Sequence, residues 1–165
     1  HLLIEMMRYL PEENLVIVGN WGGKYSQQMK DRIAELSLHN VFPLAHVSNA
    51  DKAALFRRCR GFLFPSLCEG FGLPPIEAMY FGKPVFLSPC TSLPEIGGPE
   101  NCFFDDLTPE PMAETVRSRL KRFADDAKAS ERILAWAQRF DWNRCVDGYL
   151  RYYLDILQDS RTRLR

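Results

Sequence analysis

The chain has 165 residues, a length typical of one globular domain. Its 21 basic and 21 acidic side chains cancel, which leaves no electrostatic basis for binding nucleic acid or an anionic membrane. No apolar run is long enough to cross a bilayer, and no signal-peptide pattern opens the chain. The five cysteines are odd in number and lack a C-x-x-C spacing, which predicts reduced, cytosolic thiols without a zinc site.

The first third of the chain alternates between helix and strand patterns. An uncapped helical face opens it, so we expect a fragment cut inside its first helix, without the strand that precedes it in a natural domain. The apolar run 15–19 predicts a strand covered on both faces of a parallel sheet. A helix with Met29 and Ile33 inward, a strand over 41–45 and a helix capped by Ser48-Asn-Ala-Asp51 follow.

The same alternation continues to the C-terminal helices. Strands are predicted over 61–65, 85–88 and 102–104, helices over 75–82 and from Thr108, and further helices over about 126–158. This order predicts an α/β fold, a Rossmann-like parallel sheet with helices on both faces, in one domain over 1–165. In such sheets ligands bind at the carboxyl ends of the strands.

A glycine-rich loop follows the predicted strand 61–65. Gly70 and Gly72 let backbone N–H groups approach a ligand, and the helix that Pro74 opens adds the positive end of its dipole, which suits a phosphate. Glu69 and Glu77 bracket this anion site, and their carboxylates are better suited to sugar hydroxyls than to a phosphate. The stretch therefore predicts a nucleotide-sugar site.

Each of these residues also has a structural interpretation. Ser66-x-x-Glu69 fits a capping box, although Gly-Phe-Gly follows it instead of a helical apolar run. Glu77 in a first helical turn would stabilise the helix by about 0.3–1 kcal/mol without any ligand. Phe71 fits a core position as well as a ligand contact, and Lys52 fits a solvated lysine.

The motifs together resemble a known family. Glu69 and Glu77 with Phe71, Gly72 and Pro74 between them look like the signature of group 1 (family four) retaining glycosyltransferases. Further segments match in order and spacing: Leu15-Val-Ile-Val-Gly19, Asn40-Val-Phe42, Phe64-Pro-Ser66, Gly82-Lys-Pro-Val85 and Leu93-Pro-Glu95-Ile-Gly97. The resemblance implies the C-terminal, donor-binding half of a GT-B enzyme, which has two Rossmann-like domains.

The resemblance also implies a role for each matching residue. Glu77 resembles the acid that binds the ribose hydroxyls, and Glu69 the catalytic acid beside the transferred sugar. The segment Gly70-Phe71-Gly72-Leu73 resembles the loop that binds the distal phosphate and the sugar. Val47 and Lys52 lie where the family places its base pocket, which favours a GDP-sugar with mannose. No metal and no cofactor are expected.

Part of the family's machinery is expected outside this chain. The Arg and Lys that bind the phosphates, and the N-terminal domain that binds a glycan or lipid-linked acceptor, should lie upstream of His1, so the isolated fragment is expected to be inactive. Polysaccharide or lipopolysaccharide synthesis, in the cytoplasm with at most peripheral membrane association, is the expected setting. Two alternatives remain: another GT-B enzyme, such as a nucleotide-sugar epimerase or a phosphorylase, and a non-catalytic domain that binds nucleotide or a partner.

Overall fold

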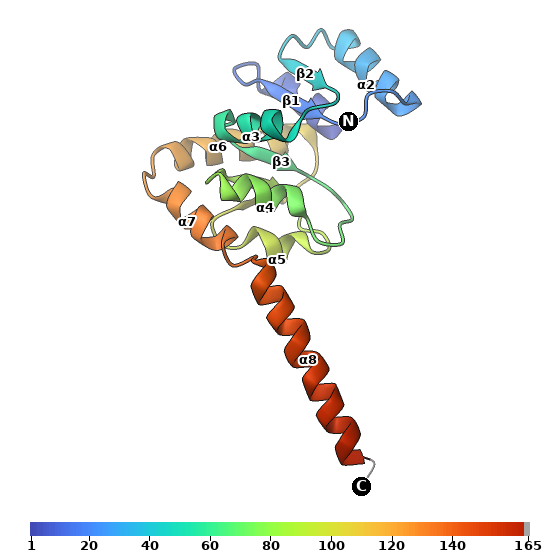
Figure 1. Cartoon of the computed structure of the whole chain (residues 1–165). Helices are drawn as coiled ribbons and strands as arrows, with labels where there is room; N and C mark the ends of the chain where they lie inside the picture. The colour runs from blue at the N-terminus through green and yellow to red at the C-terminus, as the bar shows by residue number, and fades with distance from the viewer. Residues whose placement is uncertain (164–165) are drawn as a thin grey trace.

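The computed structural model describes residues 1–163, with the side chains of 1–158, and has an α/β architecture (Figure 1). Its five strands pair only in parallel, as expected, but in two separate sheets. One sheet has the order β1-β2, and the other has the order β3-β4-β5. The strands are β1 (Leu15–Val18), β2 (Val41–Leu44), β3 (Phe62–Phe64), β4 (Val85–Leu87) and β5 (Cys102–Phe103).

Helices lie on both faces of the larger sheet, because neighbouring side chains of β4 enter different cores. Phe86 packs in one core with α1 (Leu2–Met6) and α6 (Pro109–Ala124). Val85 and Leu87 pack in the other core with side chains of four helices. These are α3 (Asn49–Arg58), α4 (Leu73–Tyr80), α5 (Leu93–Gly97) and α7 (Ala129–Ala137). The prediction of helices on both faces is confirmed here.

The smaller sheet is covered on one face only. Leu15 and Val41 are buried, and the partly buried Ile17 joins the same core. Met29 and Ile33 of α2 (Lys24–Glu35) also pack there, as the helical spacing predicts. The alternate side chains are exposed by 38–45%: Val16, Val18, Phe42 and Leu44. The prediction that the first strand is covered on both faces is therefore wrong, because the helical side chains pack only against its Leu15 side.

A helix forms at the N-terminus, as the apolar spacing predicts, but it is not an α-helix throughout. The α-helix ends at Met6, and a short 3₁₀ turn, η1 (Met7–Tyr9), continues it. Ile4, Met6, Met7 and Leu10 are buried, while Leu3 is only partly buried. Ile4, Met7 and Leu10 recur at every third residue, which is the spacing of a 3₁₀ helix.

The C-terminal helix α8 (Trp142–Arg163) extends away from the rest of the molecule (Figure 1). It begins after Asp141, whose Oδ1 accepts hydrogen bonds from the N–H groups of Asn143 at 2.8 Å and Arg144 at 3.2 Å. Every side chain from 142 to 158 is exposed, including the apolar ones that the helical spacing places together. The segment 126–158 is thus largely helical, as expected.

Two further observations concern the apolar character of the helices and the state of the cysteines. Among the helices that the structure describes, none has the length and apolar character needed to span a membrane. All five cysteines are unpaired thiols. Burial raises the pKa of the Cys59 and Cys102 thiols, so these two are less reactive than an exposed thiol.

Candidate functional site

The glycine-rich loop runs from β3 into α4, as the sequence predicts. The helix begins at Leu73, directly after Gly72, and not at the second proline. Gly72 has a φ of 111°, and a Cβ at this position would lie 3.1 Å from side-chain atoms of both Leu93 and Ile96. Glycine is favoured here on both grounds, because L-residues rarely adopt this φ and a Cβ would press on two side chains of α5.

The residues that lead into α4 are mostly exposed. Gly70, Phe71 and Leu73 are exposed, whereas Gly72 is buried beneath them. Phe71 is 49% exposed, so it is not a core residue, and its ring touches Phe140 edge-on. Pro74 and Pro75 have no N–H, so the backbone donors that could bind an anion at this helix start are those of the loop and of Leu73.

Along the chain, Glu69 precedes this helix start and Glu77 follows it. Glu69 is half-buried in the loop, and no helix follows Ser66, whose Oγ lies 3.4 Å from the Cys68 carbonyl oxygen. The capping-box interpretation of Ser66 and Glu69 is therefore wrong. Glu77 lies beyond the first turn of α4, which contains no acidic residue, so its expected place in that turn is also wrong. Both corrections weaken the purely structural interpretation of the two acids.

Lys52 and Glu77 come together across the α3–α4 contact. Lys52 Nζ lies 2.8 Å from Glu77 Oε1, and both side chains are half-exposed. Ser48 caps the helix that carries Lys52: its hydroxyl accepts from the Asp51 N–H at 3.1 Å in the predicted capping box, and its carbonyl oxygen accepts from the Lys52 N–H at 2.9 Å. The hydrogen bonds from Ser48 hold the pKa of the Asp51 carboxyl below its ordinary value.

A cavity of about 210 Å³ adjoins this ion pair. It is small compared with ligand pockets, so it has room for part of a ligand only. Val47 is half-buried in the turn that precedes α3, and it is not among the cavity's lining residues. The lining residues are Asn49, Lys52, Ala53, Phe56, Glu77, Tyr80 and Phe81.

Sequence reasoning missed the segment that follows β4. Thr91 Oγ1 accepts a hydrogen bond from the Glu69 N–H at 3.0 Å, and Ser92 Oγ donates to the Phe71 carbonyl oxygen at 2.7 Å. The available signal was topological: β4 neighbours β3 in a parallel sheet, so the loops after both strands meet at one edge.

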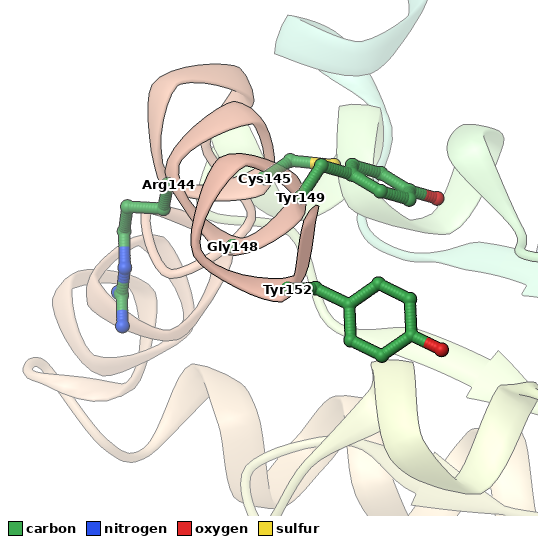
Figure 2. A pocket seen from close by; sticks show the side chains of 5 residues that line it. All are labelled: Arg144, Cys145, Gly148, Tyr149 and Tyr152. Carbon is green, nitrogen blue, oxygen red and sulfur yellow. The ribbon is translucent and has the colours of Figure 1, made fainter. Parts of the chain in front are cut away.

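A second hollow in the surface lies apart from the glycine-rich loop. Figure 2 shows a hollow on α8, where Arg144 projects from one side of the helix and Tyr149 and Tyr152 from the other. All the residues that line it belong to that one helix. Within residues 1–163, no three His, Cys, Asp or Glu side chains are grouped so that they could hold a metal ion.

Known proteins resemble this chain in sequence. The chain is 35% identical over 136 residues to the serotype-specific mannosyltransferase WbdA of Escherichia coli. The alignment covers 79% of this chain and 16% of WbdA. It is 34% identical over 110 residues to O-antigen chain mannosyltransferase B of Escherichia coli, covering 67% of this chain and 29% of that protein. The chain therefore spans well under half the length of these curated relatives.

Solved structures share the fold. The Anabaena protein Alr3699/HepE in complex with UDP-glucose superposes with a TM-score of 0.76 at 23% identity, covering 92% of this chain and 44% of that one. Sucrose-phosphate synthase of Thermosynechococcus elongatus gives a TM-score of 0.72 at 20% identity, with coverage of 95% and 43%. These neighbours establish the fold expected for one half of a GT-B glycosyltransferase.

A family model covers most of the chain. The model described as glycosyl transferases group 1 matches residues 1–136, a range that contains both sheets, the glycine-rich loop, Glu69 and Glu77. The chain belongs to the group 1 glycosyltransferases.

Proposed function

We propose that this chain is the donor-binding domain of a retaining glycosyltransferase that transfers a sugar from a nucleotide-diphosphate donor. The observation that carries the proposal is the arrangement at the start of α4. Glu69 precedes the exposed residues Gly70, Phe71 and Leu73, and Glu77 follows them on the helix. An anion site between two carboxylates fits a diphosphate with a sugar on one end and a ribose on the other.

In this proposal the loop stabilises the leaving diphosphate. Negative charge builds up on the diphosphate as the bond to the anomeric carbon breaks, so backbone donors held at Gly70, Phe71 and Leu73 lower the barrier. Glu69 hydrogen-bonds the hydroxyls of the transferred sugar while charge develops at that carbon. Glu77 binds the ribose hydroxyls. No metal ion and no cofactor take part.

The sugar and the base are proposed on different grounds. Mannose is supported by two relatives named as mannosyltransferases, at 35% and 34% identity. Guanine is favoured by the turn from Val47 to Lys52, which leads to the ion pair with Glu77. A neighbour solved with UDP-glucose illustrates the alternative base.

The remainder of the reaction is assigned to other parts of the protein. We propose that a separate N-terminal domain binds a glycan or lipid-linked acceptor and supplies the basic phosphate-binding pair. The O-antigen name of one relative supports polysaccharide or lipopolysaccharide synthesis as the setting. The proposed location is the cytoplasm, with at most peripheral contact with the membrane.

Calorimetric titration of the 165-residue chain with GDP, UDP and ADP tests the proposal. We expect weak binding with GDP bound most tightly, further weakening in Glu77→Gln, and no sugar transfer by the chain alone. Each charge-assisted phosphate contact that the chain lacks is worth about 1.5–3 kcal/mol, roughly ten- to hundredfold in affinity. A flat ranking of the diphosphates would remove the guanine preference. Sustained turnover by the isolated chain would overturn its assignment as a donor-binding half.

A further inference from the structure

The segment between β4 and α5 holds the glycine-rich loop at three points. Ser88, fully buried after β4, donates its hydroxyl to the Ser66 carbonyl oxygen. Thr91 Oγ1 accepts from the Glu69 N–H at 3.0 Å. Ser92 Oγ lies 2.7 Å from the Phe71 carbonyl oxygen and 3.2 Å from that of Glu69. Both backbone groups of Glu69 are thus bound by this one segment.

Thr91 adopts an unusual backbone conformation for this contact. Its φ is 50°, in the left-handed region that β-branched residues rarely enter. Thr91 is exposed, so burial of its side chain does not explain the conformation. Among the described residues, the side chain of Thr91 makes its hydrogen bond to the Glu69 N–H. Strain of this kind is concentrated at functional sites.

The contact determines which loop donors remain for a ligand. The Glu69 N–H is used inside the protein, so the donors that can reach a phosphate begin at Gly70. Because both ends of the Glu69 residue are held, its backbone orientation is set before any ligand arrives. A group held in place in advance loses less freedom on binding and stabilises developing charge more strongly.

We propose that Thr91 is a positioning residue that fixes the orientation of Glu69 and of the loop donors from Gly70 to Leu73. Ser92 holds the carbonyl groups of the same loop. The identity of the ligand in this inference, a nucleoside diphosphate, rests on the proposed function. The hydrogen bond and its effect on the loop do not depend on it.

The first measurement is amide hydrogen exchange of the chain without ligand, followed by NMR. Thr91→Val keeps the shape and the strained φ but removes the hydroxyl, whereas Thr91→Ser keeps the hydroxyl. We expect exchange at the Glu69 amide to rise about three- to tenfold in Thr91→Val and to stay at the wild-type rate in Thr91→Ser. Thr108→Val is the matched control, since Thr108 is exposed and its side chain caps no helix.

The second measurement is GDP affinity of the same variants by calorimetry, with thermal unfolding as the check on folding. We expect Thr91→Val to weaken GDP binding about three- to tenfold, with Thr91→Ser and Thr108→Val near wild type. Unchanged Glu69 exchange in Thr91→Val would overturn the inference. Faster exchange with unchanged GDP affinity would also overturn it, because the hydroxyl would then serve the fold alone. If the wild-type chain binds none of the three diphosphates, the proposed function fails, while the exchange comparison still decides whether Thr91 holds Glu69.

Discussion

Lys52 Nζ lies 2.8 Å from Glu77 Oε1, and this ion pair joins the first turn of α3 to the second turn of α4. Both side chains are 41% exposed, so solvent screens the pair and its contribution to stability is small. Its consequence is geometric: one oxygen of the proposed ribose-binding carboxylate is already held on the side of the proposed base pocket.

Replacing Lys52 should therefore affect nucleotide binding more than folding. In Lys52→Met we expect GDP affinity of the chain to fall at most about fivefold, the size of an exposed pair, with little change in melting temperature. Calorimetry with GDP on Lys52→Met, Glu77→Gln and the double variant checks this. The double variant should lose less GDP-binding free energy than the two single variants lose together. Lys24→Met, which removes an exposed lysine elsewhere, is the control. Strict additivity would show that the pair has no role in binding.

The two acids should differ in the kinetics of the full-length enzyme. Glu77 would contact the ribose before and during the reaction, so Glu77→Gln should mainly raise the donor KM. Glu69 would face the sugar where charge changes, so Glu69→Gln should mainly lower kcat, by about 10²-fold. Steady-state kinetics with the intact donor measure both effects.

A donor with 2′-deoxyribose is the control for this division of roles. It should impair the wild-type enzyme and add little to the defect of Glu77→Gln, because the same contact would already be lost. The reverse pattern, or changes of only a few-fold in both variants, would contradict the assignment of Glu69 and Glu77.

Gly70 and Gly72 should separate binding from stability. Gly72→Ala forces a left-handed φ on alanine and brings its Cβ within 3.1 Å of Leu93 and Ile96. We expect a loss of about 1–2 kcal/mol, and thermal unfolding should show a melting temperature lower by roughly 2–8 °C. Nothing lies within 4 Å of a Cβ at Gly70, so Gly70→Ala should keep the melting temperature and weaken GDP binding. Equal loss of stability in both variants would contradict the role given to Gly72.

Low pH should remove the contribution of the α3 capping box to the stability of the fold. The hydrogen bonds from Ser48 lower the folded-state pKa of Asp51 below its ordinary value of 3.8. A carboxyl group whose pKa is lowered by folding stabilises the fold at pH values above its ordinary pKa. This stabilisation is lost as the pH falls through the folded-state pKa. The difference in melting temperature between wild type and Asp51→Asn should be constant from pH 7 to about 5 and shrink below about 4. A difference that grows in acid would contradict this account.

Local patterns were sufficient for most of the fold. The strands 62–64 and 85–87 were predictable because their apolar runs are bounded by glycine and proline, and Ser48 to Asp51 is a purely local cap. The predicted start of α4, at residue 75, lies after its actual start at Leu73, because proline is compatible with several positions of a first helical turn. The open face of β1 could not be predicted, since an apolar run does not say whether a helix covers it.

Tertiary contacts account for what sequence reasoning missed in the site. The Lys52–Glu77 pair joins residues 25 positions apart, and no local pattern indicates such a contact. Thr91 adopts a left-handed φ, which β-branched residues disfavour, so its residue type does not predict this conformation. The roles of Glu69, Glu77, Val47 and the loop 70–73 remain predictions, which the experiments above address.

The exposed helix α8 should melt as a thermal unit of its own. None of its side chains from 142 to 158 is buried, so packing adds little to its stability in the chain alone. Circular dichroism should then lose part of the helical signal below the main transition, and α8 amides should exchange faster than those of β4. The calorimetric enthalpy per residue should accordingly fall below the value usual for a 165-residue domain.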